Sequence, residues 1–298
     1  MHGWIILDKP LGLGSTQGVS AVKRALRDSG YGKFKVGHGG TLDPLATGVL
    51  PIALGEATKL AGRMLDSDKV YEFTVCFGVE TDTLDLEGKA VAESTMRPTL
   101  AQVEAVLPRF TGPIEQVPPA YSALKVNGER AYDLARAGAD VVLAGRAVTI
   151  HALSVVGSSA GGGGVSELTL RAYVSKGTYI RSLARDIARA LGTVGHVTML
   201  RRTRAGPFTL DQAISLDKLS ERGNGRALEQ ILLPLRAGLD DIPALSLNPD
   251  QAGLLRQGQK LVGIAVHDGY YFAVLHDVPV ALVEVADQRV RVVRGFNL

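Results

Sequence analysis

Stretches in which hydrophobic and polar residues alternate are interspersed along the chain with stretches of helical periodicity. Alternation with a period of two is typical of a half-buried β-strand, whereas apolar residues that recur every three to four positions are typical of an amphipathic helix. The predicted strands are 4–7, 71–79, 148–156, 165–174 and 208–209. The predicted helices are 19–28, 100–107, 132–137 and 179–191. The pattern predicts a mixed α+β fold.

The predicted helix 179–191 is clearly amphipathic. Its apolar residues recur at the helical period, whereas Arg181, Arg185 and Arg189 form another stripe, and Gly192 is placed to end the helix. Because Arg181 lies in the first turn, directly after a predicted strand, we expect it near a sheet edge where a site can form. Nothing apolar in the spacing of Arg185 and Arg189 indicates burial, so we expect them to reach phosphates or solvent.

The end of the chain has a different pattern. Residues 244–298 contain short predicted strands joined by polar turns, at 270–275, 280–285 and 290–293. The polar segment 221–225 and Ile242-Pro243 mark the approach to this region. We therefore predict a large domain over 1–243 and a small β-rich domain over 244–298. The glycine- and serine-rich segment 157–164 is predicted to be a flexible hairpin loop.

Composition narrows the classes of function. The chain has 298 residues, 46% of them hydrophobic, which is ample for a core. Its single cysteine, Cys76, excludes a disulfide framework and a cysteine-based zinc site, and its histidines have no paired helical spacing. We expect no metal. The sequence has neither a basic-then-apolar leader nor an apolar run of membrane-spanning length, so we expect a cytoplasmic protein without a membrane partner.

Charge is spread unevenly along the sequence. The formal net charge is only +3, but residues 171–206 contain eight basic residues and one acidic residue. A local excess of this size attracts a polyphosphate such as a nucleic acid. Residues 244–298 carry five basic and five acidic side chains, so they cannot act through gross electrostatics.

Asp43 lies in a loop of unusual composition, residues 37–51. Glycines at 37, 39 and 40 permit turns that other residues forbid, and Pro44 favours extended backbone at Asp43. Leucines on both sides indicate that the loop is held against a core, where a carboxylate must be hydrogen-bonded or paired with a cation. Asp43 is therefore a candidate catalytic acid, and an Asp that only ends a turn is the alternative.

A series of motifs runs in order through most of the chain. They occupy residues 3–12, 37–48 continued by 54–59, 66–71, 81–83, 119–125, 175–181 and 196–202. Together they resemble the TruB family of bacterial tRNA pseudouridine synthases. One departure is Gly14, where the family has a threonine; Ser15 is still expected to cap the following helix.

The resemblance implies an α+β pseudouridine synthase catalytic domain with a mixed sheet, followed by a small RNA-binding domain similar to the PUA fold. It implies an isomerase that converts a uridine of the tRNA T-loop, uridine-55 in this family, to pseudouridine. The reaction breaks the bond from ribose C1′ to N1 and rejoins the same uracil through C5, so we expect no cofactor. The implied partner is the T-arm of tRNA, and we expect a monomer without an obligate protein partner.

The resemblance also implies three catalytic residues. Asp43 matches the acid of the family, which acts as the nucleophile, and whether it attacks the uracil ring or ribose C1′ stays open. Arg181 matches the residue that pairs with this acid and orients it. Tyr71 matches the residue that stacks on the target base and handles a proton, although its position among apolar residues also fits a core aromatic.

Further residues are implied to bind the substrate. His38 matches the residue that enters the space vacated when the target base swings out of its stack. Leu200 resembles the apolar floor of the pocket, Tyr179 is expected to line it, and Lys9 is expected to support the catalytic loop. The residues expected to contact RNA phosphates are Arg185, Arg189, Arg201 and Arg202.

Two other classes fit part of the sequence. A dinucleotide-dependent enzyme is suggested by the glycines at 12–18 after a predicted strand, but their spacing is one residue too long and no acid ends a second strand about 20 residues on. A non-catalytic protein that binds or folds tRNA would carry the same basic segment and tail. Asp43, Tyr71 and Arg181 together favour an enzyme.

Overall fold

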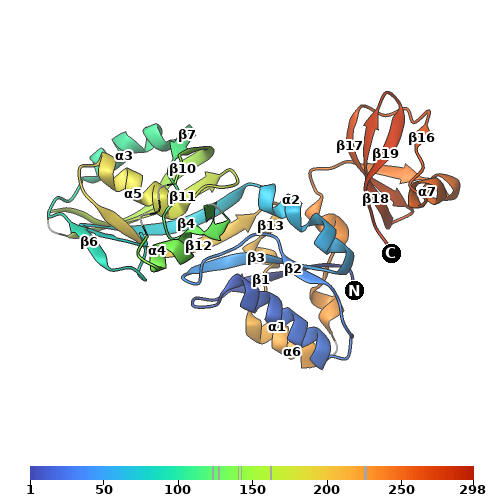
Figure 1. Cartoon of the computed structure of the whole chain (residues 1–298), viewed down its shortest axis with the longest axis horizontal. Coiled ribbons are helices and arrows are strands. Elements are labelled where there is room, and N and C mark those ends of the chain that lie inside the picture. The colour runs from blue at the N-terminus through green and yellow to red at the C-terminus, as the bar shows by residue number, and fades with distance from the viewer. Residues whose placement is uncertain (123, 127, 140, 142, 162, 225–226) are drawn as a thin grey trace. The chain divides into compact units, whose positions relative to one another are not determined.

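The computed structural model describes residues 1–122, 124–126, 128–139, 141, 143–161, 163–224 and 227–298 (Figure 1). The chain forms two compact units. Unit 1 comprises Met1–Leu42, Val49–Leu65 and Gly206–Leu298, and unit 2 comprises Asp43–Gly48 and Asp66–Ala205.

Unit 2 is built on an antiparallel sheet with helices packed against one face. The strands pair in the order β12-β4-β11-β10-β7. Their bounds are β4 Lys69–Phe77, β7 Gly112–Gln116, β10 Arg146–Gly161, β11 Gly164–Val174 and β12 Gly195–Ala205. The first residues of β3 (Ala46–Leu54) lie parallel to β12, with Ala46 opposite Leu200. The sheet is therefore mixed, as predicted.

The core of unit 2 follows from the alternation in β4. Phe73, Val75 and Phe77 are buried, whereas the residues between them are half-buried. They form one cluster with the apolar stripe of α5 (Ile180–Ala190) and with α3 (Leu100–Val106), and Figure 1 shows both helices beside the sheet. The remaining elements of unit 2 are β5 Val79–Thr81, β6 Ala90–Glu93, η2 Leu107–Phe110, β8 Lys125–Val126, β9 Glu129–Arg130 and α4 Ala131–Arg136.

Unit 1 contains the N-terminal strands and two packed helices. Strand β1 (Gly3–Lys9) pairs with β14 (Leu233–Pro234) on one side and with β3 on the other, and β2 (Val36–His38) pairs with β3. Helix α1 (Ser15–Asp28) lies against α6 (Leu216–Asn224). The other elements here are η1 Gly55–Leu60, α2 Ala61–Asp66, β13 Phe208–Thr209, η3 Leu210–Gln212, η4 Leu228–Ile231 and η5 Leu235–Gly238.

The chain ends in a small β-rich module with its own core. Its strands pair in the order β15-β17-β18-β19-β16, and α7 (Pro249–Arg256) packs against the sheet. The strands are β15 Ala244–Leu247, β16 Leu261–Val262, β17 Gly269–Leu275, β18 Val278–Ala286 and β19 Arg289–Gly295. This confirms the predicted small C-terminal β module. The domain boundary at residue 243 stays a prediction.

One local prediction needs correction. Segment 157–164 is not a loop over its length, because β10 continues to Gly161 and β11 begins at Gly164, with Ser159 opposite Glu167. Strands β10 and β11 pair as a hairpin, as predicted, but their ladder continues through glycines, serines and Ala160, which lack the alternation by which strands were predicted. The polar segment 221–225, which marks the approach to the C-terminal region, is helical through Asn224 in α6. Three residues of the predicted motifs and loops, Ala123, Gly162 and Gly225, lie outside the described residues.

Candidate active site

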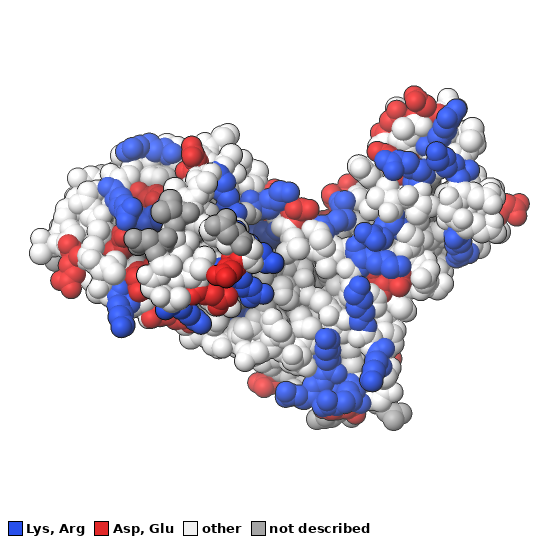
Figure 2. All heavy atoms as spheres, viewed as in Figure 1, with Lys and Arg blue, Asp and Glu red and all other residues white. Residues whose placement is uncertain are grey.

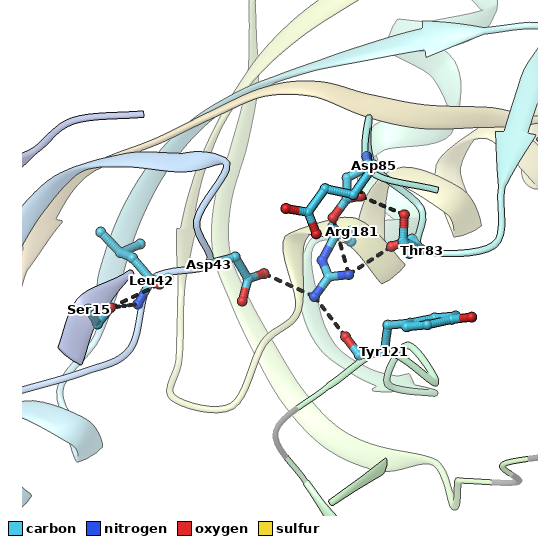
Figure 3. A network of polar contacts seen from close by, with 8 residues as sticks. Ser15, Leu42, Asp43, Thr83, Asp85, Tyr121 and Arg181 are labelled. Carbon is cyan, nitrogen blue, oxygen red and sulfur yellow. Dashed lines mark hydrogen bonds and ion pairs between the residues drawn. The ribbon is translucent and has the colours of Figure 1, made fainter. Parts of the chain in front are cut away.

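Asp43 and Arg181 form an ion pair. Asp43 precedes β3 in the glycine- and proline-rich loop, and Arg181 lies in the first turn of α5. Nη2 of Arg181 donates to Oδ2 of Asp43 at 2.9 Å (Figure 3). The Asp43 side chain is 46% exposed and the Arg181 side chain is 8% exposed. The acid is therefore accessible while the cation beside it is held inside the protein.

Three further oxygens hold the Arg181 guanidinium in place. Nη1 donates to the carbonyl of Thr83 at 2.7 Å, and Nη2 donates to the carbonyl of Tyr121 at 3.0 Å. Nη1 also lies 3.3 Å from Oδ2 of Asp85. A guanidinium has five N–H donors in a planar fork, and these partners fix both of its ends. Arg181 is a rigid positive charge at the edge of the site.

Asp85 is a second carboxylate on the same arginine, and the sequence motifs did not single it out. Its side chain is mostly buried. Oδ1 accepts hydrogen bonds from Oγ1 of Thr83 at 2.5 Å and from the backbone N–H of Glu87 at 3.0 Å. The feature of the sequence that could have pointed to Asp85 is its closeness to the motif at 81–83. Arg181 thus faces one mostly buried acid, whose Oδ1 accepts two hydrogen bonds, and one accessible acid.

Two cavities meet at the ion pair. The larger has a volume of about 430 Å³ and is lined by Asp43, Asp85, Arg181 and the aromatic residues Tyr121 and Tyr132. The smaller has a volume of only about 20 Å³ and is lined by Asp43, Arg181, Leu200 and neighbouring residues of β12. The larger cavity falls in the range of roughly 300–1,000 Å³ that is typical of small-molecule sites. The structure thus brings Leu200 and Asp43 to one cavity.

Tyr71 lies on the same strand face as the core. It is half-buried on β4, opposite Ala172 on one side and Arg202 on the other, and it packs against the cluster that contains Phe73. It is not among the residues that line the two cavities described above. Phe73 lies opposite Leu200 on the neighbouring strand. Tyr71 is two residues from Phe73, so its side chain is on the same face of the sheet as Leu200.

Several basic residues on and near α5 contact other side chains or backbone groups of the protein. The guanidinium of Arg146 lies 4.8 Å above the ring of Tyr179. Arg185 is only 13% exposed, because it pairs with Asp186 and donates from Nη2 to the carbonyl of Val117 at 3.1 Å. The expectation that Arg185 is exposed is therefore wrong. Arg189 is 57% exposed and pairs through two nitrogens with Glu80.

Arg202 also departs from the exposed position expected of a phosphate contact, because it is 1% exposed. It lies on β12 between β3 and β4, opposite Gly48 and Tyr71, where both sides of the strand are paired. Arg201 is half-buried, and its Nη1 lies 3.4 Å from the hydroxyl of Thr47. The charge pattern of the sequence did not reveal that Arg202 is buried.

The basic segment is largely balanced by acids from other parts of unit 2. Figure 2 shows basic and acidic side chains interspersed on the face in view. The basic side chains of this segment that form ion pairs include Arg171, Lys176, Arg181, Arg185 and Arg189. The excess positive charge of the sequence segment is therefore not a continuous basic patch.

Burial perturbs one basic group near Tyr71. Lys69 begins β4 and is buried, and this burial, together with the positive charge of Arg202, lowers the pKa of its ammonium group to about 8. The negative charges of Asp66 and Asp68 oppose this change.

Unit 1 holds the segment before Asp43 through Ser15. Oγ of Ser15 donates to the carbonyl of Leu42 at 2.9 Å and accepts from its backbone N–H at 2.8 Å (Figure 3). The expectation that Ser15 caps α1 is wrong. Gly14 is the N-cap, and its N–H donates to Oε1 of Gln17 instead. Ser15 fixes the residue that immediately precedes the candidate nucleophile.

Lys9 and His38 also lie in unit 1. Lys9 is buried, and its Nζ donates to the carbonyls of Pro10 and Leu13, so it supports the turn between β1 and α1. His38 is half-buried at the end of β2, opposite Ile52.

Within the described residues, no group of three or more His, Cys, Asp or Glu side chains is arranged to hold a metal ion. In the same part of the chain, no helix is long and apolar enough to cross a membrane.

A mixed sheet, an accessible carboxylate paired with a buried arginine at a cavity of about 430 Å³, and a small C-terminal β module agree with the class that the sequence motifs resemble, the pseudouridine synthases. Comparison with known proteins agrees. Residues 24–180 match the model of the TruB family pseudouridylate synthase N-terminal domain, and residues 181–240 match that of the tRNA pseudouridylate synthase B C-terminal domain.

Individual relatives give the same result. The chain is 68% identical to tRNA pseudouridine synthase B of Novosphingobium aromaticivorans, over 100% of this chain and 98% of the relative. It is 61% identical to the protein of that name from Zymomonas mobilis, over 100% and 96%. A solved structure titled Crystal Structure of a Cbf5-Nop10-Gar1 Complex has a TM-score of 0.71 at 26% identity and covers 95% of this chain and 78% of its own. The chain belongs to the TruB family of pseudouridylate synthases, and it is an isomerase.

Proposed function

We propose that this enzyme converts uridine-55 in the T-loop of tRNA to pseudouridine, with Asp43 as the nucleophile. Relatives named tRNA pseudouridine synthase B support tRNA as the substrate. The observation that carries the assignment of Asp43 is its 2.9 Å contact with Arg181 at the mouth of the 430 Å³ cavity. Among the site residues described above, only Asp43 has a carboxylate that is substantially exposed and is paired with a buried cation.

The proposed chemistry conserves every atom of the substrate. A carboxylate oxygen of Asp43 adds either to the uracil ring or to ribose C1′, and the bond between C1′ and N1 breaks. The uracil turns, a bond forms between C1′ and C5, and the bond between Asp43 and the substrate breaks, which returns the free carboxylate. The C5 proton leaves and N1 gains a proton. No electron is gained or lost, so the reaction requires neither an oxidant nor a cofactor. Arg181 offsets the negative charge of Asp43 and orients it for attack.

Access to the base requires that it leave the stack of the folded RNA. We propose that the target uridine is flipped into the cavity beside Asp43, with Leu200 as apolar floor and Tyr71 as the aromatic face for the base. In this proposal His38 enters the space that the base vacates, and Tyr179 lies at the rim of the pocket. Lys9 supports the turn between β1 and α1. The lining of the smaller cavity by both Asp43 and Leu200 supports this arrangement.

RNA binding outside the pocket is assigned to exposed groups. Arg189, which is more than half exposed, is the strongest phosphate-contact candidate on α5. Arg201 on β12, which is half-buried, is the second candidate. Arg185 and Arg202 are better described as structural because both are mostly buried. We propose that residues 244–298 form a separate RNA-binding domain, and that the enzyme acts as a cytoplasmic monomer without an obligate protein partner.

The test is a reaction of purified enzyme with unmodified tRNA transcript and no additive. Pseudouridine formation leaves the mass unchanged, so the product is detected by chemical labelling followed by primer extension. We expect one stop, at position 55, and no stop with a transcript in which that uridine is replaced by cytidine. The reaction should survive EDTA on a T-arm stem-loop. A stop elsewhere, or none, would refute the substrate assignment.

A further inference from the structure

Gln116 is a buried amide, 1% exposed, at the end of β7. Its Oε1 accepts from the backbone N–H of Tyr179 at 2.8 Å, and its Nε2 donates to the carbonyl of Tyr179 at 3.1 Å. One side chain thus bonds both backbone groups of one residue that lies 63 positions away in the sequence.

Tyr179 is the residue from which α5 starts. It is the N-cap of this helix, and no side chain of its own caps the helix. Its carbonyl also accepts the first intrahelical hydrogen bond, from the N–H of Leu183 at 3.0 Å. The first N–H groups of a helix need partners from outside it, and Gln116 supplies the one for Tyr179. Gln116 therefore fixes the point at which α5 begins.

Arg181 lies two residues after Tyr179. The first turns of α5 make further contacts with residues 116–121. The carbonyl of Val117 accepts from Oγ of Ser182 at 2.8 Å and from Nη2 of Arg185 at 3.1 Å. The carbonyl of Tyr121 accepts from Arg181 itself. The first turn of α5 is thus bound to residues 116–121 at several successive positions, with Gln116 at the start of the segment.

We propose that Gln116 is a positioning residue for the isomerisation: by binding both backbone groups of Tyr179, it holds the first turn of α5 where the Arg181 guanidinium meets Asp43. The inference rests on the proposed roles of Asp43 and Arg181. An error of about 1 Å in the placement of a catalytic group can cost on the order of 100-fold in rate, and the 2.9 Å contact with Asp43 allows little movement.

The principal experiment replaces Gln116 by methionine, which has similar length and no hydrogen-bonding amide. We expect Gln116→Met to lower the single-turnover rate at saturating tRNA by about 10- to 100-fold, and to leave the dissociation constant for tRNA within about twofold of wild type. The two effects separate because Gln116 is buried and does not face the solvent from which RNA approaches.

A matched control removes a similar bond at the opposite end of the same helix. Thr193 is buried just after α5, and its Oγ1 donates to the carbonyl of Met96 at 3.0 Å. We expect Thr193→Val to lower the melting temperature to a similar extent and to keep the wild-type rate. Equal rate losses in the two variants would overturn the proposal, because they would show a general loss of stability.

A second variant keeps the experiment decisive if the methionine variant does not fold. In Gln116→Glu one carboxylate oxygen faces the Tyr179 carbonyl without a proton to donate, whereas the protonated acid donates in the same place as the amide. We expect its rate relative to wild type to rise as the pH falls. A constant ratio of the two rates across the pH range would contradict the proposed contact.

A double variant separates this inference from the roles on which it rests. If Gln116 acts through Arg181, Gln116→Met should lower the rate of Arg181→Lys by less than threefold, because the guanidinium it positions is already gone. Fully multiplicative losses would refute action through Arg181. A wild-type rate in Arg181→Lys alone would instead refute the proposed catalytic pair.

Discussion

The two halves of the candidate catalytic pair are built in opposite ways. Asp43 lies in a loop of glycines and a proline, is nearly half exposed, and has Arg181 as its ion-pair partner. Arg181 lies on a regular helix, is almost buried, and bonds to Asp43, Asp85 and two backbone carbonyls. The accessible group is suited to attack a substrate, and the buried group is suited to hold a fixed charge beside it.

Both halves are nevertheless secured by the same device. On the Asp43 side, the Ser15 hydroxyl bonds the N–H and the carbonyl of Leu42, one residue before the acid. On the Arg181 side, the Gln116 amide bonds the N–H and the carbonyl of Tyr179, two residues before the cation. A side chain that bonds both backbone groups of a residue restricts its rotation, so the adjacent residue keeps its direction.

The largest expected effect is on the accessible half. Asp43→Asn keeps the shape of the side chain and removes its charge, so we expect the single-turnover rate to fall by at least about 1,000-fold. Affinity for tRNA should stay within about threefold, as measured by filter binding. Substantial turnover by this variant would show that Asp43 is not the nucleophile.

A smaller loss is expected on the buried half. Arg181→Lys replaces a planar fork by a point charge that cannot satisfy Asp43, Asp85 and two carbonyls together. We expect the single-turnover rate to fall about 100-fold. Arg189→Lys on the same helix is the matched control, because its arginine is exposed and pairs with Glu80, and it should stay near wild type. Equal rates in both variants would remove the distinction between the halves.

The third effect tests the device that holds Asp43. Ser15→Ala removes both hydrogen bonds to the backbone of Leu42, and we expect about 1–3 kcal/mol of stability to be lost in urea unfolding. The single-turnover rate should fall about 10-fold. Ser20→Ala, which removes an exposed hydroxyl of the same helix that bonds Thr16, should change neither quantity. If the two serine variants behave alike, Ser15 does not position the loop.

The smallest effect separates exposed from buried arginines on α5. Arg189→Ala should lower the slope of log affinity against log salt by about one, because a single phosphate contact is lost. Arg185→Ala should leave that slope unchanged and reduce the melting temperature, because its arginine bonds Val117 and Asp186. Titration of tRNA at several salt concentrations measures both. If Arg185→Ala lowered the slope and Arg189→Ala left it unchanged, the roles proposed for these two arginines would be reversed.

Local sequence chemistry was sufficient for much of the site. Proline after Asp43 and the glycines before it singled out the loop, and the helical period placed Arg181 in the first turn of α5. Periodicity could not identify Asp85 or Gln116, because each meets its partner from a segment distant in sequence. It also misjudged Arg185 and Arg202, whose exposure depends on what packs against them.

The sequence by itself therefore determined several of the elements, the mixed α+β class and the small C-terminal β module. It also singled out the acid in its loop, although the predicted loop 37–51 includes residues 46–51, which belong to β3. These follow from periodicity and backbone preference, which act over a few residues. Only the tertiary structure decided which charges are balanced. The basic segment 171–206 is matched by Glu72, Asp66, Asp85 and Glu80 from outside it, because ion pairing and burial depend on distances in space that no local pattern encodes.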